Sequence, residues 1–316
     1  MTTAISMRPR DGRRGAALVA DERMLGLRRR VVATSYGRVV ARISPVTGDT
    51  ALVLLHGAAG SWTTWTPLLR VAERAGTPLT GVIALDLPGW GESAPTRNPI
   101  DVPTMSAIVG EVVQALGYEQ HIVVGHSLGG FLALDIAAGE PNRTRGALLV
   151  SASGPAVIDA IRRPVRGGLR LPGFAGMLLV MRGLAVIGAT GTAFVRALGR
   201  GGFLRPLSAP LFAHPARVHR SVVDALAGEI RPASFAGGAD AAASYDLERW
   251  RRIGCPVRAV SGERDVFVAD SDAAALAELI PDFTHTTLPD AGHFAAVERP
   301  ELVLHELRIL IEGLPV

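Results

Sequence analysis

Two stretches of the chain show short apolar runs that alternate with segments of helical periodicity. In the first stretch, continuous apolar runs predict buried strands over 51–55, 79–85, 122–124 and 147–150. The spacing of apolar residues predicts helices over 62–73, 105–116 and 130–138. The second stretch repeats the alternation, with predicted strands over 257–261 and 283–288 and predicted helices over 271–279 and 294–312. Strands that alternate with helices predict an α/β fold built on a mostly parallel sheet with helices on both faces.

Between the two stretches the alternation stops. Residues 155–245 hold no clear strand, several prolines, and apolar segments that arginines interrupt. Their uncharged runs are shorter than the roughly 18–20 residues that a membrane-spanning helix needs. We therefore expect one α/β domain with a helical cap inserted over a pocket. The predicted parts are a basic, flexible tail over 1–27, a core over 28–154 that opens with an antiparallel hairpin, the cap over 155–245, and the rest of the core over 246–316.

A serine flanked by glycines follows one of the predicted strands. The strand over 122–124 runs directly into Gly125-His126-Ser127-Leu128-Gly129, and a predicted helix comes next. A strand, a Gly-x-Ser-x-Gly turn and a helix form the context of a nucleophile elbow. The neighbours of the serine must be small in so tight a turn, and the helix N-terminus behind it faces any negative charge that develops there. These features indicate that Ser127 is a nucleophile.

Two further reactive side chains follow predicted strands in the second stretch. Asp265 follows the strand over 257–261 and His293 follows the strand over 283–288, so both are expected at the carboxyl edge of the sheet. His293 would accept the serine proton, and Asp265 would orient the imidazole and stabilise its cation. Asp270 and Asp290 are alternative acids. We favour Asp265, because a triad acid belongs on a loop beneath the histidine.

A glycine-rich segment after the strand over 51–55 supplies candidate backbone donors. The sequence His56-Gly57-Ala58-Ala59-Gly60 carries little side-chain bulk and lets the backbone approach a ligand closely. We expect the amides of Ala58 and Leu128 to stabilise the oxyanion. Trp62 and His126 are the candidate substrate contacts, and His126 is also expected to pack as a structural histidine.

Five segments, in this order along the chain, resemble the α/β-hydrolase family. They are His56-Gly57, residues 86–93 (Asp-Leu-Pro-Gly-Trp-Gly-Glu-Ser), residues 125–130 (Gly-His-Ser-Leu-Gly-Gly), Gly262-Glu263-Arg264-Asp265 and Gly292-His293-Phe294. The likeness runs from about residue 31 to the C-terminus, is weakest across 155–245, and is closest to the capped branch of esterases and carbon–carbon bond hydrolases. This resemblance implies a serine nucleophile, no metal and no organic cofactor. It implies no particular substrate.

The charge of the chain is distributed unevenly. All 33 basic residues are arginine, and the net charge is +4. Residues 155–245 carry 11 arginines against 4 acidic residues and residues 1–30 carry 8 against 3, so the rest of the chain is acidic. Arginines on solvated helix faces are the simpler interpretation, and peripheral contact of the cap and tail with an anionic membrane is the alternative. A nucleic-acid partner is not expected, because no aromatic platform accompanies the arginines.

The expected function is hydrolysis of a small to medium, largely apolar ester through an acyl-enzyme. Cleavage of a carbon–carbon bond in a diketone-like substrate by the same triad is one alternative, and a ligand-binding receptor that keeps only the pocket is another. An epoxide or halide hydrolase would need a carboxylate nucleophile, and Ser127 speaks against it. The single cysteine, Cys255, excludes an internal disulfide, and no signal peptide is recognisable, so we expect a cytoplasmic protein. The sequence carries no sign of the oligomeric state.

Overall fold

An eight-stranded sheet forms the centre of the molecule. The computed structural model describes residues 15–94 and 100–314. The strands lie in the spatial order β1-β2-β4-β3-β5-β6-β7-β8; β1·β2 and β2·β4 are antiparallel, and the other five pairs are parallel. Their bounds are Arg28–Thr34 (β1), Gly37–Ile43 (β2), Thr50–Leu55 (β3), Val82–Leu85 (β4), Gln120–His126 (β5), Thr144–Val150 (β6), Val257–Gly262 (β7) and Phe283–Leu288 (β8). The mostly parallel sheet that the sequence predicts is confirmed.

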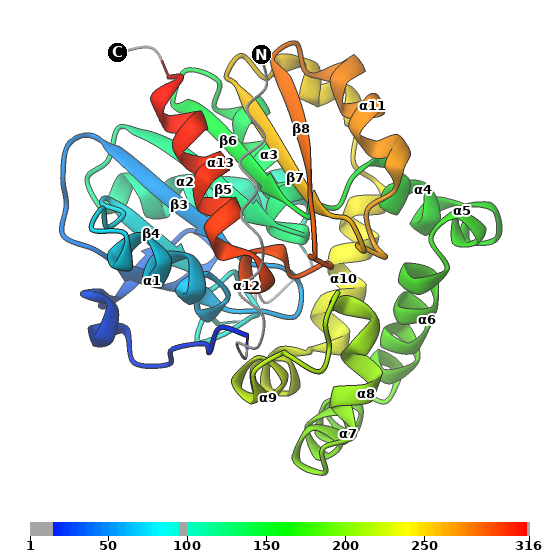
Figure 1. The fold of residues 1–316 in the computed structure, drawn as a ribbon. Coiled ribbons are helices and arrows are strands. Elements are labelled where there is room, and N and C mark those ends of the chain that lie inside the picture. The colour runs from blue at the N-terminus through cyan, green and yellow to red at the C-terminus, as the bar shows by residue number, and fades with distance from the viewer. Residues whose placement is uncertain (1–14, 95–99, 315–316) are drawn as a thin grey trace.

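Helices cover both faces of this sheet (Figure 1). Side chains of α1, α12 and α13 pack on one face, and side chains of α2, α3 and α11 pack on the other. The bounds are Thr66–Arg74 (α1), Val102–Ala115 (α2), Leu128–Gly139 (α3), Asp270–Leu279 (α11), Ala295–Glu298 (α12) and Pro300–Glu312 (α13). Successive side chains of a strand point to opposite faces, and this separates two apolar clusters. In β3, Leu54 belongs to the cluster with α1, α12 and α13, and Leu55 belongs to the cluster with α2, α3 and α11. The predicted α/β architecture is therefore confirmed.

Local backbone conformation explains why three predicted elements begin or end elsewhere in the structure. The closing helix predicted over 294–312 is divided into α12 and α13, because Arg299 precedes a proline and has φ −134°, outside the helical range. Strand β4 begins at Val82, later than predicted, because Gly81 has φ +63° and belongs to the preceding turn. The helix predicted from residue 62 starts as a 3-10 turn, Trp62–Trp65, before α1.

A helical insertion joins β6 to β7 and lies on one side of the core (Figure 1). Its α-helices are Pro155–Arg162 (α4), Pro164–Arg170 (α5), Pro172–Val186 (α6), Ala189–Arg200 (α7), Leu204–Ser208 (α8), Arg220–Glu229 (α9) and Pro232–Ala243 (α10). Four of them begin with proline, which suits the first turn of a helix. At α5 and α6 the proline also ends the helix before it. Across the described part of the chain, no helix combines the length and the apolar character that crossing a bilayer requires.

Residues 15–27 pack on the body of the protein. The N–H of Val19 donates to Thr66 Oγ1 (3.1 Å), and the N–H of Leu18 donates to Ser221 Oγ (2.9 Å) in the insertion. Val19 and Leu27 are buried. The structure therefore corrects the predicted flexible tail over residues 15–27, where apolar burial anchors the segment. The first fourteen residues of that predicted tail lie outside the described residues.

Candidate active site

Ser127 lies in a strained turn between β5 and α3. Its φ of 52° and ψ of −116° are angles that a residue with a side chain adopts only when its surroundings impose them. The N–H of Ser127 donates to the Val150 carbonyl on β6 (3.1 Å), and the Ser127 carbonyl accepts from the N–H groups of Phe131 and Ser153 (both 3.1 Å). These bonds fix the turn from two sides. The side chain stands at the carboxyl edge of the sheet and lines a cavity.

The glycines around Ser127 allow this close packing. A Cβ atom on Gly129 would lie 2.2 Å from the Leu55 carbonyl oxygen, and one on Gly125 would lie 2.1 Å from the Gly129 carbonyl oxygen. Atoms cannot approach so closely, so no larger residue fits at either position without moving the backbone. A Cβ atom on Gly57 would lie 3.0 Å from Ser127 Cβ, which shows how near the glycine-rich segment comes to the serine.

The structure brings Asp265 and His293 together. Asp265 follows β7 and His293 follows β8, and Nδ1 of the imidazole lies 3.0 Å and 3.2 Å from the two carboxylate oxygens. Asp265 Oδ1 also accepts the N–H of Phe267 (2.9 Å). Burial acts to raise the pKa of Asp265, but the charge and hydrogen bonds of its neighbours, His293 first, outweigh it and lower the pKa below its ordinary value. Asp265 is thus a carboxylate at neutral pH.

The two alternative acids have other surroundings. Asp290 lies 3.3 Å from Nε2 of His214. Asp270 is the first residue of α11.

Because Asp265 engages Nδ1 of His293, Nε2 is the ring nitrogen left to exchange a proton. His293 lines the same cavity as Ser127, so the serine, the imidazole and its carboxylate meet at one edge of the sheet.

The cavity beside Ser127 is mainly apolar. Its empty volume is about 870 Å³, counting space open to solvent. Phe267 and Phe294 line it from the core, and Phe174 and Phe235 line it from the insertion. Within the described ranges, its lining contains no arginine, aspartate or glutamate. Such a cavity favours an uncharged, largely apolar ligand.

His126 forms part of the cavity wall. Its Nε2–H donates to the carbonyl oxygen of His293 (2.9 Å), and its ring packs against Phe294 with 4.9 Å between centroids. Burial, together with the nearby charge of His293, lowers the pKa of His126 to about 3. The ring is therefore neutral at neutral pH. It supports the backbone of His293 and also borders the space open to a ligand.

Three hydrogen bonds hold the glycine-rich segment in place. Trp90 Nε1–H donates to the Ala58 carbonyl (2.8 Å). The N–H of Leu87 donates to Nε2 of His56 (3.0 Å), so Nδ1–H of that ring donates to the Gly57 carbonyl (2.7 Å). The loop after β4 thus supports the segment after β3. The sequence does not indicate this contact of Trp90, because a lone tryptophan gives no sign that its indole N–H reaches another loop.

The two expected oxyanion donors border the cavity. Ala58 and Leu128 both line it, and in the described part of the chain neither backbone N–H donates to a protein acceptor.

Trp62, the other expected substrate contact, lies elsewhere. It is buried, the Arg42 guanidinium lies over its ring at 4.9 Å from the centroid, and it is not among the described residues that line the cavity. The structure corrects the prediction that Trp62 contacts substrate, because the 3-10 turn that starts there directs the indole into the core.

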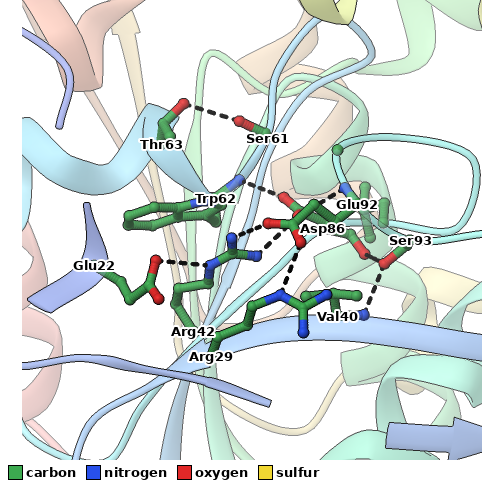
Figure 2. Close-up of polar contacts among 12 residues, drawn as sticks. Glu22, Arg29, Val40, Arg42, Ser61, Trp62, Thr63, Asp86, Glu92 and Ser93 are labelled. Carbon is green, nitrogen blue, oxygen red and sulfur yellow. Dashed lines mark hydrogen bonds and ion pairs between the residues drawn. The ribbon is translucent and has the colours of Figure 1, made fainter. Parts of the chain in front are cut away.

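A buried ion network supports the same region (Figure 2). Asp86 accepts the N–H of Trp62 (2.9 Å) and the N–H of Glu92 (3.1 Å). Arg42 lies 3.3 Å from Asp86, pairs with Glu92, and approaches Glu22 at 3.7 Å. The side chains of Arg42 and Asp86 are only 5% and 1% exposed. Asp86 therefore stabilises its own turn at Glu92 and also holds Trp62, two residues after the glycine-rich segment.

Arg231 connects the insertion to the loop after β4. Its Nη1 donates to the Gly89 carbonyl and its Nη2 to the Gly91 carbonyl, both at 2.8 Å. Glu229 accepts the N–H of Gly91 (3.0 Å) from the same side. Trp90, which lies between these glycines, is the residue that holds the Ala58 carbonyl. A chain of contacts therefore runs from the insertion to the candidate oxyanion segment.

Comparisons with known proteins agree with this architecture. A model of the alpha/beta hydrolase family matches residues 52–306. The dihydrolipoyllysine-residue acetyltransferase component of the acetoin cleaving system of Pseudomonas putida is 29% identical over 274 residues, which cover 82% of this chain but only 63% of that protein. RutD of Shigella flexneri, named as a candidate carbamate hydrolase, is 26% identical over 81% of this chain and 89% of its own. The solved structure of the epoxide hydrolase CorEH superimposes with a TM-score of 0.69 at 22% identity, over 90% of this chain and 99% of that one.

Proposed function

The chain belongs to the α/β-hydrolase family, and from this premise we propose that it is a hydrolase that cleaves a small to medium, largely apolar ester through an acyl-enzyme on Ser127. One observation carries the proposal: the imidazole of His293 lies 3.0 Å from the buried carboxylate of Asp265, beside the cavity that Ser127 lines. The strained turn of Ser127 adds support, because such strain persists where function requires it.

Acylation uses three side chains in named roles. Ser127 Oγ attacks the ester carbonyl carbon, and Nε2 of His293 takes the hydroxyl proton. Asp265 accepts the Nδ1–H bond and stabilises the imidazolium that forms. When the tetrahedral intermediate collapses, the carbon–oxygen bond to the alcohol breaks and the imidazolium gives its proton to the leaving oxygen. Water then attacks the acyl-enzyme in the same way, and the acid leaves with Ser127 restored.

Two backbone amides stabilise the negative charge of the tetrahedral intermediate. We assign the N–H groups of Ala58 and Leu128 to this role, because both border the cavity and neither is used by another protein acceptor in the described chain. Donors that are already oriented stabilise the developing charge without reorganising, which is commonly a large part of catalysis. The start of α3 at Leu128 adds the favourable end of a helix dipole.

The insertion acts as a cap that selects the substrate. Its residues Phe174, Met177 and Phe235 form the wall of the cavity opposite the sheet. The apolar lining favours uncharged acyl and alcohol groups, because an ionised group would lose its hydration there without a partner. The preferred acyl length is then set by the shape of this wall.

A panel of p-nitrophenyl esters with short to long acyl chains tests this function. Wild type and Ser127→Ala are compared side by side, and we expect the variant to lose on the order of 10³-fold or more in kcat. A p-nitrophenyl carbamate and a diketone are included as further substrates. Equal activity of the two proteins would show that another residue is the nucleophile. Turnover of the diketone alone would move the function to carbon–carbon bond cleavage, and tight ligand binding without any turnover would favour a receptor.

A further inference from the structure

The insertion presents an apolar surface to solvent. Fifteen large hydrophobic residues are exposed in the described part of the chain, and nine of them lie between residues 165 and 207. We define the outer surface of the insertion by six of these side chains, which lie on the successive helices α5 to α7 and directly before α8: Val165, Leu169, Leu179, Val186, Phe194 and Phe203. A concentration of exposed apolar side chains on one part of a protein marks a contact surface.

Helix α6 shows the two sides of this arrangement. Phe174 and Met177 line the cavity beside Ser127, whereas Leu179 and Val186 are 74% and 87% exposed. Arg182 is the single charged residue in the helix. A helix that is apolar on all sides belongs in apolar surroundings on all sides. The protein provides such surroundings where α6 lines the cavity and packs against α4, α5, α7 and α10, whereas Leu179, Val180 and Val186 are exposed to solvent, so this part of the helix surface lacks a partner.

The charge of the insertion indicates which partner fits. Each of its four acidic residues is paired with arginine: Asp159 with Arg163 and Arg170, Asp224 with Arg220, Glu229 with Arg231, and Asp240 with Arg182. The insertion carries 11 arginines, so a positive excess remains. Arg166 stands between Val165 and Leu169 on α5, and Arg200 ends α7; both are exposed. Arginines interspersed with exposed apolar side chains match an anionic lipid headgroup layer above acyl chains.

We propose that the outer surface of the insertion rests on a lipid bilayer that contains anionic lipids. The apolar side chains enter the boundary between headgroups and acyl chains, the arginines bind lipid phosphates, and α6 lies between the bilayer and the cavity. A second copy of the chain fits less well, because a symmetric pairing of this face would bring the arginines of the two copies together. The binding stands apart from the ester chemistry and would hold for any reaction at Ser127.

Flotation with lipid vesicles tests the proposal. The full chain is mixed with vesicles of phosphatidylcholine alone or of phosphatidylcholine with phosphatidylglycerol, at low and high sodium chloride. We expect binding at least about tenfold stronger to the anionic vesicles, and weaker binding at high salt because the ions screen the arginines. Little preference between the two vesicles, or no flotation with either, would overturn the proposal.

Two sets of variants separate the apolar and the charged parts of the surface. Leu179→Gln/Val186→Gln/Phe194→Gln removes apolar contacts, with Met24→Gln/Val46→Gln as the control at exposed apolar sites elsewhere. Arg166→Gln/Arg200→Gln removes charge, with Arg74→Gln/Arg252→Gln as the control. Each arginine at the surface contributes on the order of fivefold, so the charge variant should lose on the order of 25-fold in vesicle binding while its control keeps most of it. Equal losses in the variants and in their controls would contradict a defined docking surface.

Two further readings complete the experiment. Hydrolysis of a water-soluble ester should be the same in all these proteins, and it reports that the cavity is intact. If wild type hydrolyses no ester, the proposed function fails while the vesicle result still decides the membrane proposal. Sedimentation velocity tests whether a second copy of the chain covers the surface instead. If wild type is a dimer and the apolar triple variant is a monomer, a second copy covers the surface and the proposal is overturned.

Discussion

Backbone strain gathers at the edge of the sheet where the candidate triad lies. Of the described residues other than glycine, Ser127, Ser151 and Asp290 have positive φ, and each follows a strand at its carboxyl end. Such conformations cost about 1–3 kcal/mol each. Hydrogen bonds from the neighbouring strand offset this cost at the two serines: Ser127 N–H reaches Val150 and Ser151 N–H reaches Val260 (2.8 Å). The sheet thus holds the reactive turn in a backbone conformation that the residue would not keep without these hydrogen bonds.

The fit of Gly129 gives a prediction for this turn. In Gly129→Ala the new methyl would lie 2.2 Å from the Leu55 carbonyl, so the turn must shift. We expect kcat/KM to fall on the order of 100-fold or more, since small displacements of reacting groups have effects of this size. Gly139→Ala, at the exposed end of the same helix with no atom within 4 Å of the new Cβ, is the control. It should keep full activity, and similar losses in both variants would refute the packing argument.

Buried His121 gives a prediction for stability against pH. Its Nε2 bonds Thr144 Oγ1 (2.9 Å), and burial, with the nearby charge of Arg143, lowers its pKa to about 4. The unfolded chain, with an ordinary histidine pKa of about 6.5, therefore binds more protons between these two values, and stability falls as the pH drops through this window. This one residue should cost up to about 2 kcal/mol by pH 5 relative to pH 7.5.

Urea denaturation at the two pH values measures this effect. His121→Gln keeps a side-chain N–H donor for the Thr144 hydroxyl but has no group that titrates in the window. The free energy of unfolding of the variant should therefore change less between pH 7.5 and pH 5 than that of wild type. An equally large change in both proteins would mean that His121 is not a source of the acid sensitivity.

At the scale of elements, the loop after β4 connects three parts of the fold. It receives the Arg42 side chain from β2, it carries Trp90 to the segment after β3, and it accepts Arg231 from the insertion. None of these contacts involves a triad residue. Each of these contacts nevertheless influences the position of the Ala58 amide. The loop is therefore the element through which stability and catalysis are expected to be coupled.

Arg42 tests the contribution to stability. Arg42→Met leaves the carboxylate of Asp86 buried without its cation, and breaking a buried pair in this way typically costs about 3–5 kcal/mol. Arg29→Met removes an ion pair to Glu92 in which both side chains are more than 40% exposed, and it should cost less than about 1 kcal/mol. Chemical denaturation of both variants measures their free energies of unfolding and compares the two losses. Equal and small losses would show that the network around Asp86 contributes little.

Arg231 tests the contribution to catalysis. Arg231→Met frees the turn at Gly89 and Gly91, so Trp90 should hold the Ala58 carbonyl less firmly and kcat should fall about tenfold with little change in KM. Arg205→Met also removes a guanidinium that donates to backbone carbonyls, in this case those of Pro215, Ala216 and Val218, all within the insertion. Its kcat should stay near that of wild type. A fall in both variants would indicate a general loosening of the insertion instead.

For the whole molecule, the sheet explains how distant residues meet. Ser127, Asp265 and His293 are up to 166 positions apart, and each follows a parallel strand whose carboxyl end lies at one edge. Because parallel strands bring their carboxyl ends together, the sequence alone could predict that these residues share an edge and that the fold is α/β. The seven-helix insertion was predictable as a break in the alternation. Its packing was not.

The contacts that the sequence could not predict are of one kind. Arg42 and Arg231 are two among 33 arginines, and nothing near them in the chain indicates that one enters the core and the other reaches a distant loop. Residues 15–27 look like a polar tail, yet Val19 and Leu27 are buried. Trp62 stands next to the glycine-rich segment in the sequence, but a 3-10 turn directs it inward. Long-range pairing and local turn geometry decided these cases.

The measurement that tests the central claim most directly is covalent labelling with a p-nitrophenyl phosphonate, followed by mapping of the modified peptide. An activated serine displaces p-nitrophenol and keeps the phosphonate, so we expect one adduct per chain, located on Ser127. Ser127→Ala should take up no label, and His293→Ala should react on the order of 10³-fold more slowly because its serine lacks a base. An adduct on another residue, or a wild-type chain that the reagent leaves unmodified, would contradict the account.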